Sequence, residues 1–356
     1  MPKRRTLSVA LIGTKFMGRA HSNAWRQAPH FFDLPADIRM AAICGRDRAA
    51  TRRTAKTLGW EKSIHDWRTI MADPDIDIVD ICTPNDSHSD IAIAAARGGK
   101  AILCEKPLAR NVAVLCHNYR RVPAIVLAKQ MIDAGELGDR IYHFRARYAQ
   151  DWIADENFPL VWRLQSKVAG SGALGDIGAH IIDLARFLVG EISRIAAVSE
   201  TFVKRRLTKN RRAARVDVDD AVSIIGKFRN GAMLNAEATR FARGRKNQLS
   251  FEVNGSGGSL VFDLEKMNRL RFYNASDSGH ARGFRDIIVT ESNHPYVANW
   301  WPPGHLLGYE HSFVHTIADF VVAVVAHTQI RPDFADGLKT QHVLDVIQRA
   351  RSLVEL

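Results

Sequence analysis

The stretch Ile76–Leu108, IDIVDICTPNDSHSDIAIAAARGGKAILCEKPL, decides the fold of this 356-residue chain. An apolar run ends at Thr83-Pro84-Asn85 and is followed by an alanine-rich segment that ends at Gly98-Gly99. A second apolar run then leads into Glu105-Lys106-Pro107. Serine before an alanine-rich segment and glycine after it are typical of the two ends of a helix. The stretch therefore predicts a strand–helix–strand unit.

The polar sequences that follow these two strands are expected to lie close together. Parallel strands that are buried on both faces read as continuous apolar runs, and ligands of such sheets bind at the carboxyl ends of the strands. Thr83-Pro84-Asn85 and Glu105-Lys106-Pro107 are therefore expected to face the same crevice. A lysine at such a position, followed by a proline, indicates chemistry rather than solubility.

A glycine loop follows the first predicted strand, Leu7–Ile12, and precedes a helix that runs through Trp25. In a dinucleotide-binding fold the sequence G-x-G-x-x-G belongs here, because glycines let backbone amides approach a pyrophosphate. Lys15 stands where the second glycine is expected, so either the loop lies further out or the lysine reaches a phosphate. The residues expected to contact the dinucleotide are Gly13, Lys15, Phe16, Met17 and Gly18.

The end of the second predicted strand, Ile38–Cys44, bears on the form of the dinucleotide. An acidic residue there reads the ribose hydroxyls of NAD, whereas an arginine accommodates the extra phosphate of NADP. Here Arg46 precedes Asp47, and both are expected to contact the nucleotide. The pattern slightly favours NADP.

The connection after Pro107 is too short for a standard crossover. Val112–Cys116 reads as the next core strand, yet only residues 106–111 separate it from the previous one. A parallel crossover needs a dozen or more residues, usually a helix. Either this strand pairs differently, or a helix present in related chains is absent here.

Two domains are expected from the length of the chain. Residues 1–121 form the first, an α/β domain with a doubly wound parallel sheet. Residues 122–356 form the second, an α+β domain with an open-faced, predominantly antiparallel sheet and flanking helices; its last helix, 338–354, is free to pack back on the first domain. The strands expected in its sheet are 142–148, 197–203, 221–228, 232–239, 249–254 and 259–264, and its other helices are 122–138 and 310–326.

Composition restricts the partners of this chain. The net charge is +12, but the basic runs lack interleaved aromatic residues or a recognition motif, so no nucleic-acid partner is expected. No stretch approaches the roughly 18 apolar residues of a membrane span, so no membrane partner is expected. The four cysteines have no metal-ligand spacing and read as buried thiols of a reducing compartment. We therefore expect a cytoplasmic protein.

Asp176 and His180 are four residues apart at the start of a predicted helix, so their side chains share one face. A helix cap and a buried, hydrogen-bonded histidine would also explain the pair. Three nearby glycines, at 170, 172 and 175, imply close backbone approach and favour a functional site. His311 and His315 have a spacing that zinc can use, but without a third ligand no metal is expected.

Three motifs together resemble the glucose–fructose oxidoreductase / inositol dehydrogenase / MocA family. They are Glu105-Lys106-Pro107, Thr83-Pro84-Asn85 with His88, and Asp176-x-x-x-His180. The resemblance covers nearly the whole chain. It implies an N-terminal Rossmann domain and a C-terminal open sheet that is often buried in a homodimer or homotetramer. It also implies hydride transfer between NAD(P) and a hydroxyl or keto carbon of a sugar, glycoside or inositol.

The resemblance further implies roles for individual residues. Lys106 hydrogen-bonds the reacting oxygen, His180 is the general acid and base, and Asp176 orients the substrate or the histidine. The implied cofactor contacts beyond the glycine loop are Thr83, Pro84, Asn85, His88, Glu105 and Lys106, and the implied substrate contacts are Lys106, Asn118, Arg120, Arg163, Asp176 and His180.

Two other functions remain open at this point. One is a glycosidase that uses transient oxidation of the sugar ring and keeps its NAD bound. The other is a non-catalytic sensor of NAD(P), which Lys15 and the short connection favour and which the presence of Lys106, Asp176 and His180 disfavours.

Overall fold

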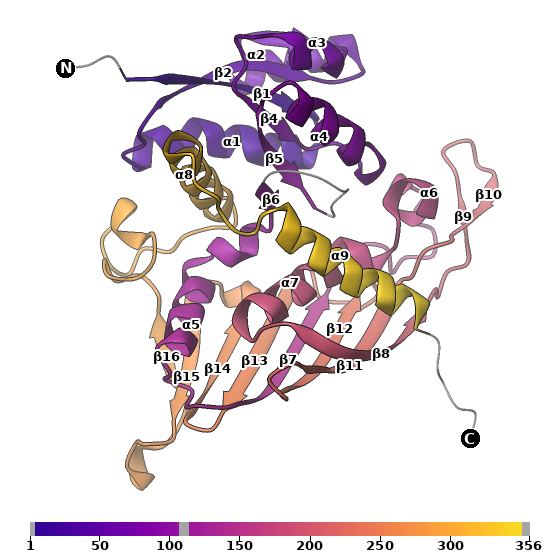
Figure 1. Ribbon diagram of the computed structural model, residues 1–356. Helices are drawn as coiled ribbons and strands as arrows, with labels where there is room; N and C mark the ends of the chain where they lie inside the picture. Colours follow the sequence, from indigo (N-terminus) through magenta and orange to yellow (C-terminus); the bar gives the residue numbers. More distant parts are fainter. Residues whose placement is uncertain (1–3, 107–113, 351–356) are drawn as a thin grey trace. The chain divides into compact units, whose positions relative to one another are not determined.

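The computed structural model describes residues 4–106 and 114–350, which form two compact units (Figure 1). The first unit comprises residues 1–121 and 308–339, and the second comprises 122–307 and 340–356. The chain first crosses between units after Arg121, where the sequence placed the boundary. Residues 308–339 were expected in the second domain but return to the first unit, because their long apolar helix packs there.

The first unit is built on a six-stranded parallel sheet. Its strands are β1 (Thr6–Ile12), β2 (Asp37–Cys44), β3 (Lys62–Ile64), β4 (Ile78–Ile81), β5 (Ala101–Glu105) and β6 (Val114–Cys116). They lie in the order β3-β2-β1-β4-β5-β6, which is the order of a complete Rossmann sheet. The expected doubly wound parallel sheet is confirmed, and the strand order reverses between β1 and β4.

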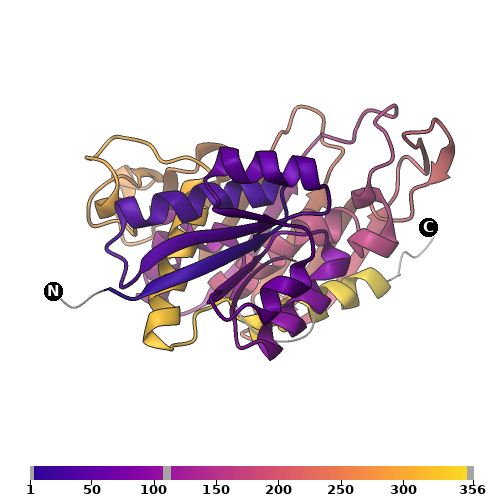
Figure 2. The same ribbon diagram turned by 90° about the horizontal axis from the view of Figure 1, so that it is seen from above.

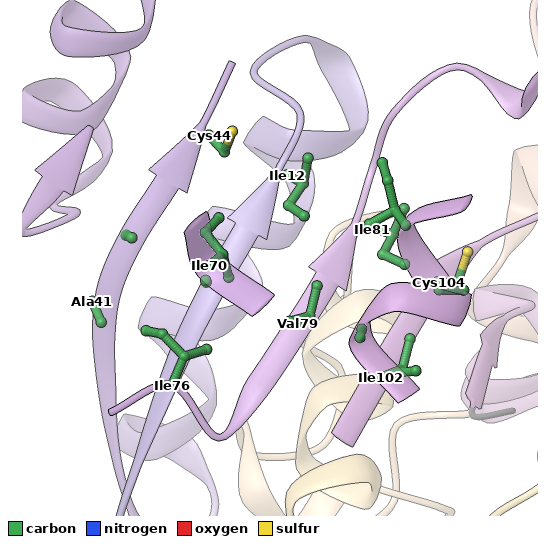
Figure 3. Close-up of a cluster of buried hydrophobic side chains, with 14 of the residues drawn as sticks. Ile12, Ala41, Cys44, Ile70, Ile76, Val79, Ile81, Ile102 and Cys104 are labelled. Carbon is green, nitrogen blue, oxygen red and sulfur yellow. The ribbon is translucent and has the colours of Figure 1, made fainter. Parts of the chain in front are cut away.

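Helices cover both sides of this sheet (Figure 2). They are α1 (Phe16–Phe31), α2 (Arg48–Leu58), α3 (Trp67–Ala72), α4 (His88–Arg97) and α8 (His311–Ala326). On one face, α3 and α4 pack on a cluster of isoleucines, alanines and other apolar residues, in which Ile70, Val79 and Ile81 are fully buried (Figure 3). Each such side chain contributes about 1.5–3 kcal/mol by its removal from water. On the other face, α8 packs beside α1, with the rings of Trp25 and Phe320 6.4 Å apart.

The strand after the short connection pairs in parallel with β5, so the first of the two alternatives, a different pairing, is wrong. Leu103 lies opposite Val114 and Glu105 opposite Cys116. The strand begins at Val114 rather than Val112, and residues 107–113 lie outside the described part of the chain. The outer edge of β6 is bridged by the returning segment, since the Leu115 amide donates to the Pro332 carbonyl over 2.9 Å.

The second unit is built on an eight-stranded sheet in the order β16-β15-β14-β13-β7-β12-β11-β8. The strands are β7 (Ile141–Ala149), β8 (Ile192–Glu200), β11 (Ala221–Phe228), β12 (Met233–Thr239), β13 (Gln248–Gly255), β14 (Gly258–Asp263), β15 (Arg269–Asn274) and β16 (Arg285–Ile288). Neighbours are antiparallel except β7 and β12. The expected open-faced sheet is confirmed, because the described helices of this unit lie over one face of the sheet (Figure 1). A separate two-stranded hairpin joins β9 (Arg205–Leu207) and β10 (Ala213–Arg215).

The helices of the second unit differ in length from the expected ones. α5 (Pro123–Asp133) ends short of Gly138, before Gly135, which has a φ of 78°. α6 (Ser166–Ala169) is a single turn, and α7 (Ala179–Leu188) lies over the sheet beside α5. α9 (Phe334–Arg349) begins four residues before the expected position and continues from the first unit into the second. Within residues 4–106 and 114–350, no helix is long and apolar enough to cross a membrane.

Candidate functional site

The glycine loop at the end of β1 leaves no room for side chains at two positions. Gly13 has a φ of 127°, and a Cβ atom there would lie 2.4 Å from the Cys82 carbonyl oxygen. A Cβ atom on Gly18 would lie 2.0 Å from the Gly13 carbonyl oxygen. The loop is therefore closed tightly on the next strand and on the first turn of α1, whose amides face the loop. This arrangement suits an anion such as a pyrophosphate.

Lys15 occupies the loop without distorting it. Its φ of −93° and ψ of −153° lie in the ordinary extended region, which any L-residue adopts. Its carbonyl accepts the first helical hydrogen bond from the Arg19 amide over 2.9 Å, and its side chain is exposed. Replacement of the second glycine is therefore compatible with a regular loop. Phe16 is exposed beside it, with its ring stacked on Tyr309 at 6.4 Å.

The end of β2 forms a second close approach. A Cβ atom on Gly45 would lie 2.6 Å from Oγ1 of Thr51. Asp47 caps α2, since its Oδ1 accepts from the Ala50 amide over 2.9 Å, and this bond lowers the pKa of the carboxyl group. Asp47 and Arg46 are both exposed at the strand end. Asp47, which was expected to contact the ribose, thus uses one carboxylate oxygen to cap α2.

Hydrogen bonds from its own side chains to its backbone stabilise the turn after β4. The Ser87 hydroxyl donates to the Pro84 carbonyl over 2.7 Å, and His88 Nε2 donates to the Thr83 carbonyl over 2.8 Å. His88 is 1% exposed, and its bond to the Thr83 carbonyl fixes the shape of this turn. Thr83, Pro84 and Asn85 are partly exposed in this turn, at the carboxyl end of the sheet.

Glu105, at the end of β5, points into the unit. Its Oε1 lies 3.0 Å from Nε2 of His21, and Nδ1 of the same ring lies 2.9 Å from both oxygens of Asp80. Burial alone raises the pKa of Glu105, but the hydrogen bond and charge of His21 and the charge of Lys106 lower it below its usual value. Glu105 was expected to contact the cofactor; its carboxylate is instead bound to His21. Lys106 follows directly and is partly exposed.

Two of the expected substrate contacts are engaged inside the first unit. The Asn118 amide donates to the Ser312 hydroxyl over 2.9 Å. Arg120 forms an ion pair with Asp336 at 3.0 Å and is 6% exposed. Both side chains therefore join the first domain to its returning segment. His311 and His315 lie in α8, and each ring bonds to a backbone group, at Gly308 and Arg121 respectively.

In the second unit, Asp176 lies in a single π-helical turn, Leu174–Gly178, which leads into α7. Such turns are rare and occur frequently at functional sites. Oδ1 of Asp176 lies 3.9 Å from Nε of Arg163, and Oδ2 lies 3.7 Å from Nη1 of Arg240. The Arg240 side chain is fully buried, whereas those of Asp176 and Arg163 are 26% and 39% exposed. Asp176 thus presents a carboxylate whose position two arginines define.

The turn is fastened by Asp219, whose carboxylate accepts from the amides of Gly172 and Leu174, each over 2.7 Å. A Cβ atom on Gly172 would lie 1.7 Å from the Asp219 carbonyl oxygen, which explains a glycine here. His180 follows on the first turn of α7 and is 7% exposed.

The ring of His180 lies 6.0 Å from that of Tyr148 on β7. The Tyr148 hydroxyl donates to Oδ1 of Asn247 over 2.8 Å, and the same oxygen accepts from the Gln150 amide over 2.7 Å. An aromatic ring, that of Tyr148, therefore lies beside His180, and hydrogen bonds hold its hydroxyl group and the neighbouring Asn247 side chain in place.

Several of these residues were missed by the sequence argument. Asp80 is the one charged residue in the buried strand IVDI, and that exception was the available signal. Its partner His21 lies in the middle of a helix with no motif to mark it. Tyr148 was read only as part of a strand and Arg240 only as part of a basic run at a strand end, because nothing in a strand pattern shows which residues neighbour a helix turn.

The residues of the first unit fit a dinucleotide. The two glycines provide the close approach, α1 provides amides for the pyrophosphate, and the strand order reverses at this point, as in dinucleotide-binding sheets. The fold and this loop define a nucleotide-dependent enzyme of the Rossmann class. The second unit adds a carboxylate and a histidine, which are groups suited to binding hydroxyls and moving a proton.

The family assignment follows from comparison with known proteins. Residues 7–122 match the oxidoreductase family with an NAD-binding Rossmann fold, and residues 125–261 match the GFO/IDH/MocA C-terminal domain. The chain therefore belongs to the Gfo/Idh/MocA oxidoreductase family. The resemblance of the motifs is confirmed, and so is the expected class, an oxidoreductase of the sugar and polyol type. Of the expected NAD(P), binding of NAD is supported.

Three similar proteins illustrate the assignment. Levoglucosan dehydrogenase of Pseudarthrobacter phenanthrenivorans is 42% identical, with 96% of this chain and 95% of that protein covered. A solved oxidoreductase domain protein from Kribbella flavida is 49% identical at a TM-score of 0.94, with 97% of both chains covered. A solved levoglucosan dehydrogenase in complex with NADH and levoglucosan is 43% identical at a TM-score of 0.94, again with 97% of both chains covered.

Proposed function

We propose that this protein is an NAD-dependent dehydrogenase of an anhydro sugar of the levoglucosan type. The observation that carries the proposal is the 43% identity, over 97% of the chain, to a structure that holds NADH and levoglucosan. The partly exposed Asp176 and Arg163 provide an acceptor and a donor for sugar hydroxyls. A small polar ligand with several hydroxyl groups can hydrogen-bond to both of these side chains.

In the proposed reaction, the bound NAD accepts a hydride from a carbinol carbon of the sugar. His180 takes the hydroxyl proton as the alcohol becomes a ketone, and in the reverse direction it returns that proton. Lys106 donates a hydrogen bond to the reacting oxygen and stabilises the negative charge that develops on it. Asp176 accepts from a second hydroxyl and so orients the sugar ring.

The choice between NAD and NADP rests on the residues at the end of β2. Arg46 slightly favours NADP, whereas the related structure holds NADH. We propose NAD as the working cofactor, because Asp47 keeps a charged carboxylate at the strand end, where a 2′-phosphate would meet it. Fluorescence titration with NADH and NADPH tests this choice. Tighter binding of NADPH would restore the preference expected from Arg46.

The substrate is tested by measuring NADH formation from NAD with levoglucosan, glucose, inositol and sorbose at equal concentrations. We expect the highest kcat/KM with levoglucosan, and a large fall in the rate of NADH formation in Lys106→Ala and His180→Asn. A higher kcat/KM with inositol would reassign the substrate. Hydrolysis of a glycoside with NAD that stays bound would replace the dehydrogenase with the redox-type glycosidase.

We further propose that the open face of the second unit's sheet is buried against a second copy in a homodimer or homotetramer. This face carries exposed Val198, Ile225 and Met233 on neighbouring strands. Light scattering of wild type, Ile225→Glu and the control Leu306→Glu tests this. Leu306 is equally apolar and 66% exposed, but it lies outside the sheet. Dissociation of Ile225→Glu alone is expected; an unchanged mass would refute the assignment of this face.

A cytoplasmic location remains a proposal as well. Its support is that Cys44, Cys82, Cys104 and Cys116 are free thiols and buried, as in proteins of reducing compartments. Fractionation of the source cells would test it.

A further inference from the structure

A buried ionic bridge connects the helix of the glycine loop to the strand that carries the reactive lysine. His21 belongs to α1, which begins at the loop, and Glu105 is the last residue of β5. Asp80, on β4 between them, completes the bridge. The three residues are 1%, 6% and 0% exposed respectively, so the bridge lies in the interior of the first unit.

The geometry determines how many protons the bridge holds. Nδ1 of His21 lies 2.9 Å from Asp80, and Nε2 lies 3.0 Å from Glu105. A neutral imidazole has one N–H and would turn a lone pair toward one of the carboxylates. Both nitrogens therefore carry protons, and the ring is an imidazolium that donates to both acids. Asp80 receives a further hydrogen bond from Nε1 of Trp25 over 2.7 Å, which stabilises its charge.

The remaining groups around the ring do not neutralise it. Burial raises the pKa of the Cys116 thiol to about 11, and Sγ lies 3.7 Å from Nε2 of His21. Burial also raises the pKa of Cys82 well above its usual value, with Sγ 3.6 Å from Asp80. Both thiols are thus neutral. Phe313, from α8, covers the ring at 5.4 Å, and Tyr309, whose pKa burial raises well above its usual value, also lies within electrostatic reach of the bridge.

Burial alone would lower the pKa of His21, but the charge and hydrogen bond of Asp80 raise it well above its usual value, which agrees with the geometry. The bridge contains one cation, His21, and two anions, Asp80 and Glu105. One of the two anions, Glu105, directly precedes Lys106, and Lys106 and Glu105 attract each other.

We propose that His21 is a positioning residue for Lys106: it clamps Glu105 and Asp80 and so fixes the end of β5 against α1. This inference rests on the proposed role of Lys106 in the reaction. The backbone of Glu105 is paired with Cys116 on β6, and its side chain is held by His21, so the residue before the lysine is held twice. Loosening one of the two attachments displaces the lysine from the reacting oxygen.

The test compares His21→Gln with His315→Gln. His315 is also a buried histidine of the first unit, 0% exposed, but it donates to the Arg121 carbonyl over 2.8 Å and does not contact Glu105. For His21→Gln we expect kcat for levoglucosan to fall by about 100-fold, the cost of a displacement of roughly 1 Å. We expect the KM for the sugar and the Kd for NADH to stay unchanged. For His315→Gln we expect wild-type kcat.

Nitrogen-15 NMR of labelled wild-type protein provides a second, independent readout. Both nitrogens of His21 are expected to be protonated at neutral pH, above the pH of about 6.5 at which an ordinary histidine loses its proton. Because neither NMR nor NADH binding requires sugar turnover, failure of the proposed substrate leaves this test intact. A neutral His21 ring at neutral pH would overturn the proposal.

Three kinetic results would also overturn it. These are a wild-type kcat in His21→Gln, an equal loss in His315→Gln, or a parallel loss of NADH affinity, which would assign the bridge to stability of the fold. If His21→Gln does not fold, Glu105→Gln replaces it. This variant keeps the shape and removes the charge that the imidazolium binds, and the same selective fall in kcat is expected.

Discussion

The two units hold their functional groups in different ways. In the first unit, the loop and the strand end are set by steric necessity and buried charge: Gly13 has no space for a Cβ atom, and Asp80 and Glu105 are almost fully buried. In the second unit, Asp176 and Arg163 are partly exposed, whereas Arg240 beside Asp176 is buried. The rigid, buried arrangement of the first unit suits a cofactor whose structure does not vary. The second leaves polar groups available to a sugar.

This difference predicts that substitutions in the two units separate the kinetic constants. Changes to the glycine loop should act on NAD affinity, and changes around Asp176 should act on the sugar. Changes to Lys106 should act on the chemical step itself.

The largest effect is expected for Lys106→Ala. Loss of a hydrogen-bond donor to a developing oxyanion reduces kcat by about 10²–10³-fold. Steady-state kinetics of NADH formation measure the loss, with the exposed Lys56→Ala as the control. Full activity of Lys106→Ala would remove the lysine from the mechanism.

A smaller effect is expected for Gly13→Ala, which forces a side chain against the Cys82 carbonyl at a φ of 127°. Strain of this kind costs about 1–3 kcal/mol, so NADH should bind roughly 10- to 100-fold more weakly. Gly99→Ala is the matched control, because Gly99 has a φ of 68° with nothing within 4 Å of an added Cβ atom. Equal NADH affinity in the two variants would contradict the role of the loop.

Asp176→Asn should weaken sugar binding and leave NADH binding intact. The amide replaces a charged acceptor, and hydrogen bonds to charged groups contribute about 1.5–3 kcal/mol against about 1 kcal/mol for neutral ones. We expect the KM for the sugar to rise about tenfold, measured at saturating NAD. A parallel rise in the Kd for NADH would contradict the assignment of nucleotide binding to the first unit and of sugar binding to Asp176 in the second.

The smallest effect concerns stability and compares two histidines of the first unit. Burial lowers the pKa of His315 to about 3, so its contribution is present above about pH 6.5 and is lost as the pH falls below that value. The pKa of His21 is raised, so its contribution is present below about pH 6.5 and is lost as the pH rises through the raised value.

Urea unfolding between pH 5 and pH 9 measures both contributions. His315→Gln should reduce the loss of stability on acidification, by at most about 1.4 kcal/mol per pH unit. His21→Gln should be most destabilising at the acidic end of the same range relative to wild type. Identical pH dependence in the two variants would show that the two rings have the same charge.

Much of this architecture is predictable from local sequence. Continuous apolar runs and the glycine loop identify the parallel sheet, and alternating residues such as those of β7 identify the second sheet. The three family motifs predict Lys106, Asp176 and His180. The return of residues 308–339 to the first unit was missed, because an apolar helix shows that it is buried but not against which partner.

The candidate site is less predictable than the fold. Asn118, Arg120 and His88 are polar residues near motifs, but their side chains bind other parts of the protein. Lys15 was expected to move the loop outward or to reach a phosphate, because the motif contains glycine there, and its backbone angles are ordinary. The ionic bridge of His21 joins three elements, and such long-range pairing leaves no periodic signal in a sequence.

The most direct test of the account counts the products formed from NAD and levoglucosan by the purified protein. We expect one NADH for each oxidised sugar, sustained over many turnovers, and NADH formation slowed about 10²–10³-fold with Lys106→Ala. Absence of NADH with every sugar tested, or NADH that stays bound while the sugar is hydrolysed, would contradict the assignment as a dehydrogenase.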